Sequence, residues 1–264
     1  MSKLSSELVK RARKRLLEMH FRAGVGHIGG NLSALDALLV LHHEVLGPQD
    51  VFVLAKGHAA GALYVTLWSL GKLSDEDLNT FHQDGTFLAG HPVAGWSKEI
   101  PFATGSLGHG LPDAIGMALG YGLQSQSGEV FCLTSDGEWQ EGSNWEALIF
   151  AVHRRLTNLT ILIDENRLQG FGSTAAVASM DPLENRFQGF QIPVVSVNGH
   201  DHAAIRNTLH ARGKGPRIIL LKTIKGHGVS FMENAMQWHY LPLNAEQYRI
   251  ALRDIDGLHE KSLY

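Results

Sequence analysis

Apolar residues follow two different periods along this chain, and from about residue 51 onward the two periods alternate. Short continuous apolar runs are typical of buried strands, and they predict strands from residue 51 and over 129–136, 158–166, 192–199 and 217–223. Apolar residues at helical spacing predict the intervening and final helices, over 112–124, 142–156, 201–212 and 245–255. This alternation predicts an α/β fold with a doubly wound, mainly parallel sheet and helices on both faces.

Before the first strand, the chain is predicted to be mainly helical. A serine cap and helical spacing predict a helix over 5–22, and its basic run over 10–15 is interpreted as a solvated helix face. The glycines over 24–30 are expected to prevent a regular element and to let the backbone approach a ligand. The next helix is therefore predicted to begin at a cap on Ser33 and to continue through Leu46.

The composition is ordinary for a soluble globular protein, and it argues against several other classes. The chain has 264 residues, 44% of them hydrophobic, and no repeat or linker divides it, so a single domain over 1–264 is expected. A net charge of −3 argues against nonspecific nucleic-acid binding. No apolar run approaches the ~20 residues of a membrane span, and no signal-peptide core follows Met1. One cysteine, Cys132, allows no disulfide framework, which suits a cytoplasmic protein.

Oxygen-bearing side chains stand at the ends of two successive predicted strands. Asp136 closes the strand over 129–136, and Asn166 closes the next strand along the chain. Because a right-handed crossover brings such strands close together and parallel, both residues are expected at one edge of the sheet. A carboxylate, an amide oxygen and nearby carbonyls suit Mg²⁺ or Ca²⁺, and Gly137 leaves room for a diphosphate. A helix-capping aspartate and a turn asparagine explain the local sequence equally well.

Several segments, in order along the chain, resemble the N-terminal part of transketolases. The step from Asp136-Gly137 to Asn166 resembles the thiamine diphosphate motif of that family. The other similar segments are GVGHIGGNLSALD, VLAKGHAAGALY, AGHP, TGSLGHGLPDAIGMALG, DGEWQEGSNWEA, VNGHD, KTIKGHGVSFMEN and WHY. They extend over nearly the whole chain, so the resemblance is to the diphosphate-binding domain of the family and not to one motif.

The resemblance implies roles for particular residues. Mg²⁺, or Ca²⁺ in its place, would be bound by Asp136, Asn166 and the backbone carbonyl of Leu168. Thiamine diphosphate would be contacted by a second set, which comprises His58, Gly105, Leu107, Gly137, Glu138, Asn166 and His239. Catalytic histidines would face the reacting carbons of the donor sugar, at His27, His91 and His239. Imidazoles suit that work because they can orient hydroxyls and move protons near neutral pH. The remaining histidines are interpreted as surface or core residues.

Four positions depart from the family pattern. Ser135 stands where the family usually has glycine, Ile28 and Ser106 stand where it usually has proline, and His109 replaces a glutamine. The metal site is expected to tolerate Ser135, because the ligands begin at Asp136. Since Ile28, Ser106 and His109 lie along the cofactor turn and the substrate channel, the donor specificity is expected to differ from that of an ordinary transketolase.

The resemblance also implies a reaction and a partner. Transketolases transfer a two-carbon ketol unit from a ketose or ketose phosphate to an aldose acceptor. In a full-length transketolase, the glutamate that activates the cofactor and the arginines that bind sugar phosphate lie in later domains. We therefore expect this chain to be the N-terminal subunit of a split transketolase, completed by a C-terminal subunit in an α₂β₂ heterotetramer.

Two other functions are compatible with the same half-site. One is a subunit of a related acyloin-forming enzyme, either similar to deoxyxylulose-phosphate synthase or belonging to secondary metabolism. The other is a non-catalytic module that binds a diphosphate and regulates a partner. An adjacent reading frame for the C-terminal half of a transketolase would favour the split enzyme.

Overall fold

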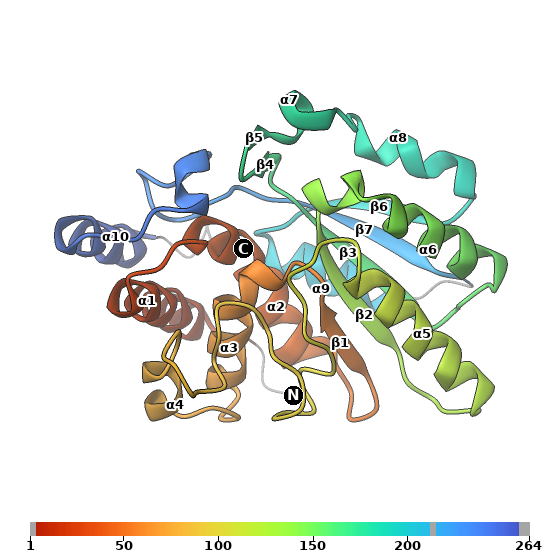
Figure 1. Cartoon of the computed structure of the whole chain (residues 1–264), viewed down its shortest axis with the longest axis horizontal. Coiled ribbons are helices and arrows are strands. Elements are labelled where there is room, and N and C mark those ends of the chain that lie inside the picture. Colours follow the sequence, from red (N-terminus) through yellow and green to blue (C-terminus); the bar gives the residue numbers. More distant parts are fainter. Residues whose placement is uncertain (1–3, 212–214, 259–264) are drawn as a thin grey trace.

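The centre of the molecule is a five-stranded parallel sheet in the order β1-β2-β3-β7-β6 (Figure 1). The structure is a computed structural model that describes residues 4–211 and 215–258. In sheet order, the strands are β1 (Val51–Leu54), β2 (Val130–Ser135), β3 (Leu159–Glu165), β7 (Arg217–Lys222) and β6 (Val194–Asn198). The predicted α/β fold with a mainly parallel sheet is confirmed.

Helices cover both faces of this sheet, which explains why its central strands are apolar along their whole length. Every residue of β2 and β3 is buried. Successive side chains of β2 enter opposite cores, since Phe131 packs on one face and Cys132 on the other. The Cys132 core lies under α5 (Gly110–Leu123), α6 (Gly142–His153) and α8 (Leu183–Phe187). The Phe131 core lies under α2 (Ile28–Val40), α3 (Ala60–Ser69) and α9 (His202–His210).

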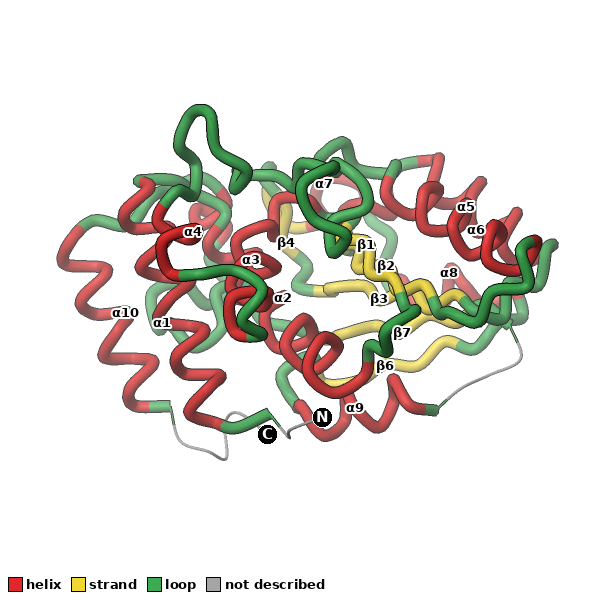
Figure 2. The backbone as a smooth tube through the Cα atoms, turned by 90° about the horizontal axis from the view of Figure 1, so that it is seen from below, coloured by secondary structure: helices red, strands yellow, loops and turns green. Residues whose placement is uncertain are grey.

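Two further helices extend the second layer away from the sheet. In Figure 2, α1 (Ser6–Ala23) and α10 (Ala245–Gly257) lie side by side beyond α2 and α3. Ser5 caps α1, because its side chain accepts a hydrogen bond from the N–H of Leu8. The predicted helix over 201–212 corresponds to α9, and its predicted end at Arg212 lies outside the described residues.

The prediction for the start of the second helix is wrong. α2 begins at Ile28, so Gly29 and Gly30 are helical, and a π turn (Leu41–Val45) follows its end. A Cβ on Gly29 would lie 3.1 Å from the side chain of Lys225, so these glycines allow a helix to pack closely instead of preventing one. Ser33 is buried inside the helix, where its hydroxyl oxygen lies 3.1 Å from the carbonyl oxygen of Gly30.

The solvated helix face predicted for the basic run is also wrong in part. Arg13 is fully buried in an ion pair with Asp36 of α2. Arg15 is 7% exposed, and its guanidinium bonds to Asp75 at 2.9 Å. Local charge density could not reveal these partners, because α1 meets them only after α2 and α4 (Asp75–Asn79) have packed against it.

Short elements gather at the carboxyl edge of the sheet. An antiparallel pair, β4 (Leu168–Gln169) and β5 (Gly172–Ser173), leads into α7 (Thr174–Ala178). Single 3₁₀ turns at this edge occupy Gly57–Ala59, Gly137–Gln140 and Met236–His239, whereas the turn at Gln188–Phe190 precedes the start of β6. None of the helices within 4–211 and 215–258 combines the length and the apolar character that crossing a membrane requires.

Candidate active site

A cavity of about 210 Å³ opens beyond the ends of β2 and β3. Its walls come from segments far apart in the sequence, including the glycine segment before α2, the turn after β1 and the turn at Met236–His239. The lining includes all of the predicted site residues except Glu138, namely His27, His58, His91, Gly105, Leu107, Asp136, Gly137, Asn166, Leu168 and His239. Sequence patterns predicted no role for several other lining residues, namely Gln169, Gly170, Phe171, Lys225 and Tyr240.

The oxygen donors predicted for a divalent cation lie together in this cavity. Asp136 follows β2 directly, and its two carboxylate oxygens accept from the N–H groups of Gly137 at 2.7 Å and Arg167 at 2.5 Å. Asn166 follows β3, and its Oδ1 accepts from the N–H of Leu168 at 3.0 Å. These bonds orient the oxygens, and a carboxylate or amide oxygen that accepts one bond retains a second lone pair for a metal.

The electrostatics of Asp136 also suit a cation. Burial, followed by the charge of the neighbouring Asp164, raises the pKa of Asp136 to about 7. A divalent cation would stabilise the ionised carboxylate and remove this penalty. Gly137 also lines the cavity, and a Cβ there would make ordinary van der Waals contact with Gln169 at 3.5 Å, so no protein atom requires glycine at this position. The residues present therefore fit a hard cation with an anionic ligand next to it.

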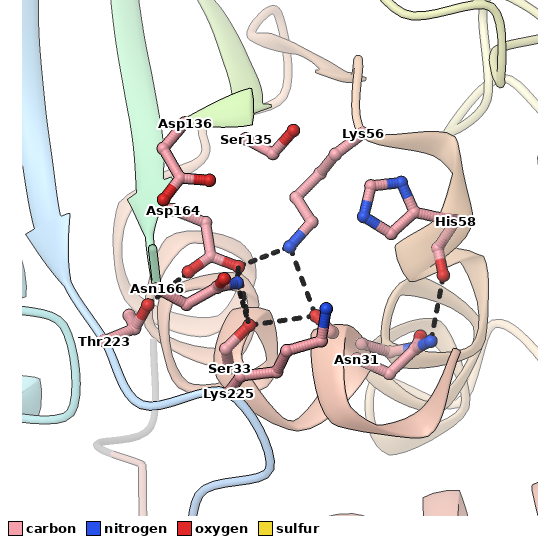
Figure 3. Close-up of polar contacts among 12 residues, drawn as sticks. Asn31, Ser33, Lys56, His58, Ser135, Asp136, Asp164, Asn166, Thr223 and Lys225 are labelled. Carbon is pink, nitrogen blue, oxygen red and sulfur yellow. Dashed lines mark hydrogen bonds and ion pairs between the residues drawn. The ribbon is translucent and has the colours of Figure 1, made fainter. Parts of the chain in front are cut away.

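A buried ion pair lies beneath the oxygen donors Asp136 and Asn166 (Figure 3). Lys56 and Asp164 are both fully buried and form an ion pair, and the ammonium also donates to the carbonyl of Gly30 at 3.2 Å. Ser33 donates to Asp164 at 2.6 Å, and Thr223 donates to the other carboxylate oxygen. Burial acts to raise the pKa of Asp164, but the Lys56 ammonium holds it below its usual value. The network connects β3, α2 and the turn after β1 beneath the cavity.

Lys225 brings a second buried ammonium to the cavity. Its Nζ lies 3.3 Å from the carbonyl oxygen of Leu168 and 3.0 Å from Nδ1 of His239. Burial, followed by the charge of Lys56, lowers the pKa of Lys225 to about 8, so the group is still mainly protonated at pH 7. Sequence patterns missed this residue, although it belongs to the similar segment KTIKGHG, which is a signal that could have identified it.

The four predicted histidines lie next to one another in the wall of the cavity. The ring centroid of His27 lies 5.8 Å from that of His58, 5.6 Å from that of His91 and 5.0 Å from that of His239. Burial lowers the pKa of every member, to about 4 for His27 and about 3 for His239. All four imidazoles are therefore neutral near pH 7, and His27, His58 and His91 each carry one N–H and one lone pair. The lone pair of His239 at Nδ1 accepts from the Lys225 ammonium, so His239 offers a ligand only its Nε2–H.

A tight turn around Gly105 closes the cavity opposite the strand ends. Gly105 has a φ of 147°, and a Cβ there would lie 2.9 Å from the ring of His91. Glu138 does not line the cavity. Its buried carboxylate accepts from the N–H of Gly108 at 3.0 Å and from the N–H of Ser135 at 3.3 Å. Its side chain thus connects the turn to the end of β2, and a direct contact with a cofactor stays a prediction.

The four departures from the family pattern occupy different environments. Ser135 lines the cavity and is 7% exposed, while Ile28 is fully buried at the first position of α2. Ser106 and His109 are exposed next to the Gly105 turn. Only Ser135 of the four therefore reaches the cavity wall.

A second group of potential metal ligands lies away from the cavity, at Asp36, His200 and His227. One carboxylate oxygen of Asp36 already accepts from Arg13 and His200, and the other accepts from His202. The second ring nitrogen of His200 accepts from the N–H of Ile224 at 2.8 Å. Since His200 must carry its proton on the nitrogen that faces Asp36, it has no lone pair for a metal. Asp36 and His200 therefore belong to a hydrogen-bonded core network with Arg13 and His202.

A comparison with known protein families identifies the family of this chain. The family model described as transketolase, thiamine diphosphate binding domain, matches residues 5–263. This chain belongs to the transketolase family. Members of that family are transferases.

Curated relatives of similar length are named as transketolase subunits. The chain is 37% identical over 264 residues to a subunit of the apulose-4-phosphate transketolase of Phocaeicola vulgatus, covering 94% of this chain and 92% of that protein. It is 35% identical over 257 residues to the 6-deoxy-6-sulfo-D-fructose transketolase subunit SqwG of Clostridium sp., covering 92% of this chain and 93% of that protein.

Solved transketolases share the fold but are longer. The transketolase of Campylobacter jejuni superimposes with a TM-score of 0.85 at 28% identity, over 98% of this chain and 44% of that chain. The R525L mutant of the Pichia stipitis enzyme gives a TM-score of 0.85 at 26% identity, over 100% of this chain and 42% of that chain. This chain thus spans less than half the length of these solved transketolases.

Proposed function

We propose that this chain is the diphosphate-binding subunit of a two-subunit transketolase. The enzyme would transfer a two-carbon ketol unit from a ketose or ketose phosphate to an aldose. The observation that carries the proposal is that the oxygen donors, the Lys225 ammonium and the four histidines line one cavity. Relatives of nearly the same length that are named transketolase subunits favour this function over a related acyloin-forming enzyme or a regulatory module.

The metal and the cofactor would occupy adjacent parts of the cavity. Asp136, Asn166 and the backbone carbonyl of Leu168 would hold Mg²⁺, or Ca²⁺ in its place, because all three offer hard oxygen ligands. Gly137 and Lys225 would face the diphosphate of thiamine diphosphate. The other cofactor contacts would come from His58, Gly105, Leu107 and His239. Glu138 would hold the Gly105 turn in place, because its carboxylate accepts hydrogen bonds from the backbone N–H groups of Gly108 and Ser135. When bound, the cofactor would supply the nucleophilic carbon that the protein lacks.

The remaining work of this chain falls to three histidines. His27, His91 and His239 are neutral near pH 7, so His27 and His91 can each donate one hydrogen bond to a sugar hydroxyl and accept one from another. His239 can only donate, through its Nε2–H, because its Nδ1 accepts from Lys225. A lone pair aimed at a hydroxyl can also take up its proton during bond cleavage. The ring centroids of His91 and His239 lie 5.6 Å and 5.0 Å from that of His27, so the three imidazoles form one continuous wall that a bound sugar would face.

A second chain would complete the active site. We take residues 1–264 as one diphosphate-binding domain, and we assign the pyrimidine-binding and C-terminal domains to a partner in an α₂β₂ heterotetramer. The names of the relatives, which are of nearly the same length as this chain and are called transketolase subunits, support this division. A cytoplasmic location remains a prediction from the sequence.

Co-expression with the adjacent reading frame tests the proposal. The purified complex should show ketol transfer that requires thiamine diphosphate and is lost when a chelator removes Mg²⁺, whereas this chain alone should be inactive. The donor screen should pair phosphorylated with non-phosphorylated ketoses, and it should include apulose 4-phosphate and 6-deoxy-6-sulfofructose because two relatives are named for them. Turnover by the single chain, or an inactive complex across the whole screen, would contradict the split-transketolase function.

A further inference from the structure

Asn31 is a buried amide on α2 that touches the backbone of two cavity histidines. Its side-chain nitrogen donates to the carbonyl of His27 at 2.8 Å and to the carbonyl of His58 at 2.9 Å. Its oxygen accepts from the N–H of Ala62, at the start of α3, at 2.7 Å. Asn31 is 1% exposed and does not line the cavity, so both donors and the acceptor of its amide serve the protein. Figure 3 shows the amide pointing toward the His58 carbonyl.

At His58, the Asn31 amide stands between two backbone groups that a helix would normally join. The carbonyl of His58 and the N–H of Ala62 are four residues apart, which is the spacing of an α-helical hydrogen bond. Because each group bonds to Asn31 instead, the 3₁₀ turn at Gly57–Ala59 does not merge into α3. The amide therefore holds His58 just before the helix, where its ring faces the cavity.

At His27, the same amide supports an uncommon backbone conformation. His27 has a φ of 66°, and it precedes α2 without a side-chain cap of its own. Such a conformation costs a non-glycine residue about 1 kcal/mol or more, so neighbouring contacts must maintain it. The His27 carbonyl accepts both the side-chain and the backbone N–H of Asn31, and its own N–H donates to the carbonyl of His239 at 3.0 Å.

We propose that Asn31 is a positioning residue that sets the distance between the rings of His27 and His58. It acts only through these histidines, because its amide is fully engaged and does not reach the cavity. The catalytic consequence rests on the proposed transketolase function, whereas the geometric consequence does not. Asn31→Asp keeps the shape and the acceptor but loses both donors, so it places a carboxylate against two carbonyls that then repel it.

Asn158→Asp is a matched control for this substitution. Asn158 also spans two carbonyls, with its nitrogen 3.0 Å from that of Ala118 and 3.5 Å from that of Gly128. It precedes β3 and therefore lies at the opposite edge of the sheet from the cavity. The chemical change is the same at both positions, so a general loss of stability would affect both variants, whereas displacement of the cavity histidines would occur only in Asn31→Asp.

The first measurement uses the full chain and does not depend on enzymatic activity. Ring resonances of His27 and His58, assigned through His27→Gln and His58→Gln, should shift in Asn31→Asp and stay in place in Asn158→Asp. Asn31→Ser, which retains one donor and one acceptor, should give intermediate shifts. Unmoved resonances of both histidines in a folded Asn31→Asp chain, or equal shifts in the Asn158→Asp control, would overturn the positioning role.

The second measurement uses the two-subunit complex. Asn31→Asp should lower kcat about tenfold to a hundredfold, as expected for misplaced catalytic groups, while Asn158→Asp retains wild-type turnover. Wild-type kcat in Asn31→Asp would overturn the catalytic consequence. Failure of the proposed function remains distinguishable, because the wild-type complex would then be inactive while the histidine resonances still shifted in Asn31→Asp.

Discussion

Lys225 illustrates how one buried charge can prepare a site for an anion. Its ammonium is 1% exposed and touches the Leu168 carbonyl and the His239 ring, so its position is fixed before any ligand arrives. With Lys56 close by, the interior beside the cavity carries two ammonium groups against the carboxylates of Asp136 and Asp164. A diphosphate and its divalent cation would add one anion and one cation to this arrangement. The ammonium groups and carboxylates of the protein would not have to move to receive them.

Removal of the Lys225 charge should weaken cofactor binding. Lys225→Met keeps most of the apolar stem, and the lost charge-assisted contact should raise the Kd of Mg-thiamine diphosphate about tenfold to a hundredfold. Titration calorimetry on the two-subunit complex measures this change. Lys222→Met is the matched control, because Lys222 is partly exposed and pairs with Glu165 at 2.5 Å outside the cavity. Equal affinities of the two variants would exclude Lys225 from the diphosphate site.

At the scale of elements, the segment before α2 is positioned by contact with the segment that follows β7. A Cβ on Gly26 would lie 2.4 Å from the carbonyl oxygen of Tyr240, which is closer than any real contact allows. The N–H of His27 bonds to the carbonyl of His239 at the same junction. Residues more than 200 positions apart in the chain therefore share one wall of the cavity, and glycine is required where they meet.

Adding a methyl group at this junction should destabilise the protein. Gly26→Ala should lower the free energy of unfolding by about 1–3 kcal/mol, the usual cost of overpacking, because the Tyr240 backbone cannot move freely. Gly116→Ala adds the same methyl to α5, where a Cβ would meet nothing within 4 Å, and should be neutral or stabilising by about 0.5–1 kcal/mol. Denaturant unfolding of both chains provides the comparison. A Gly26→Ala chain as stable as wild type would show that the contact is not limiting.

The whole molecule buries several histidines, and this links its stability to pH. His42 lies in the π turn after α2 with its ring 5.0 Å from that of Phe52, and burial lowers its pKa to about 3. In the unfolded chain a histidine titrates near 6.5. Between these pH values the unfolded state binds one more proton at His42 than the folded state, so this group destabilises the fold as the pH falls below about 6.5.

His42→Leu should remove this contribution. Relative to the variant, the wild-type chain should lose about 1.4 kcal/mol of unfolding free energy for each pH unit below about 6.5, and hence roughly 2 kcal/mol between pH 7 and pH 5. Urea unfolding of both chains at the two pH values measures the difference. Asp136 and Glu138, whose pKa values are raised to about 7, act in the opposite direction but are common to both chains.

His153→Leu is the control for this experiment. His153 is exposed at the end of α6, so the same substitution there should leave the pH dependence as it is in the wild type. A His42→Leu chain whose stability changes with pH in the same way as the wild type would show that His42 does not contribute to this dependence.

Local sequence was sufficient for the features of this protein that depend on neighbouring residues. Continuous apolar runs predicted β2 and β3, because strands buried on both faces need apolar side chains at every position. Strand order along the chain then predicted that Asp136 and Asn166 would meet, since a right-handed crossover leaves few other arrangements. The family resemblance added the four histidines, which the fold brings to the same cavity.

Only the tertiary structure decided the contacts between distant segments. The glycines before α2 were expected to prevent a helix, yet Gly29 is helical because it packs against Lys225 and Trp238. Arg13 was expected in solvent, yet it is buried by an ion pair with Asp36. In each case the deciding partner lies on another element. Local propensity cannot predict such contacts, because the energy of a buried charge or of a close backbone approach depends on the residues that surround it in the folded protein.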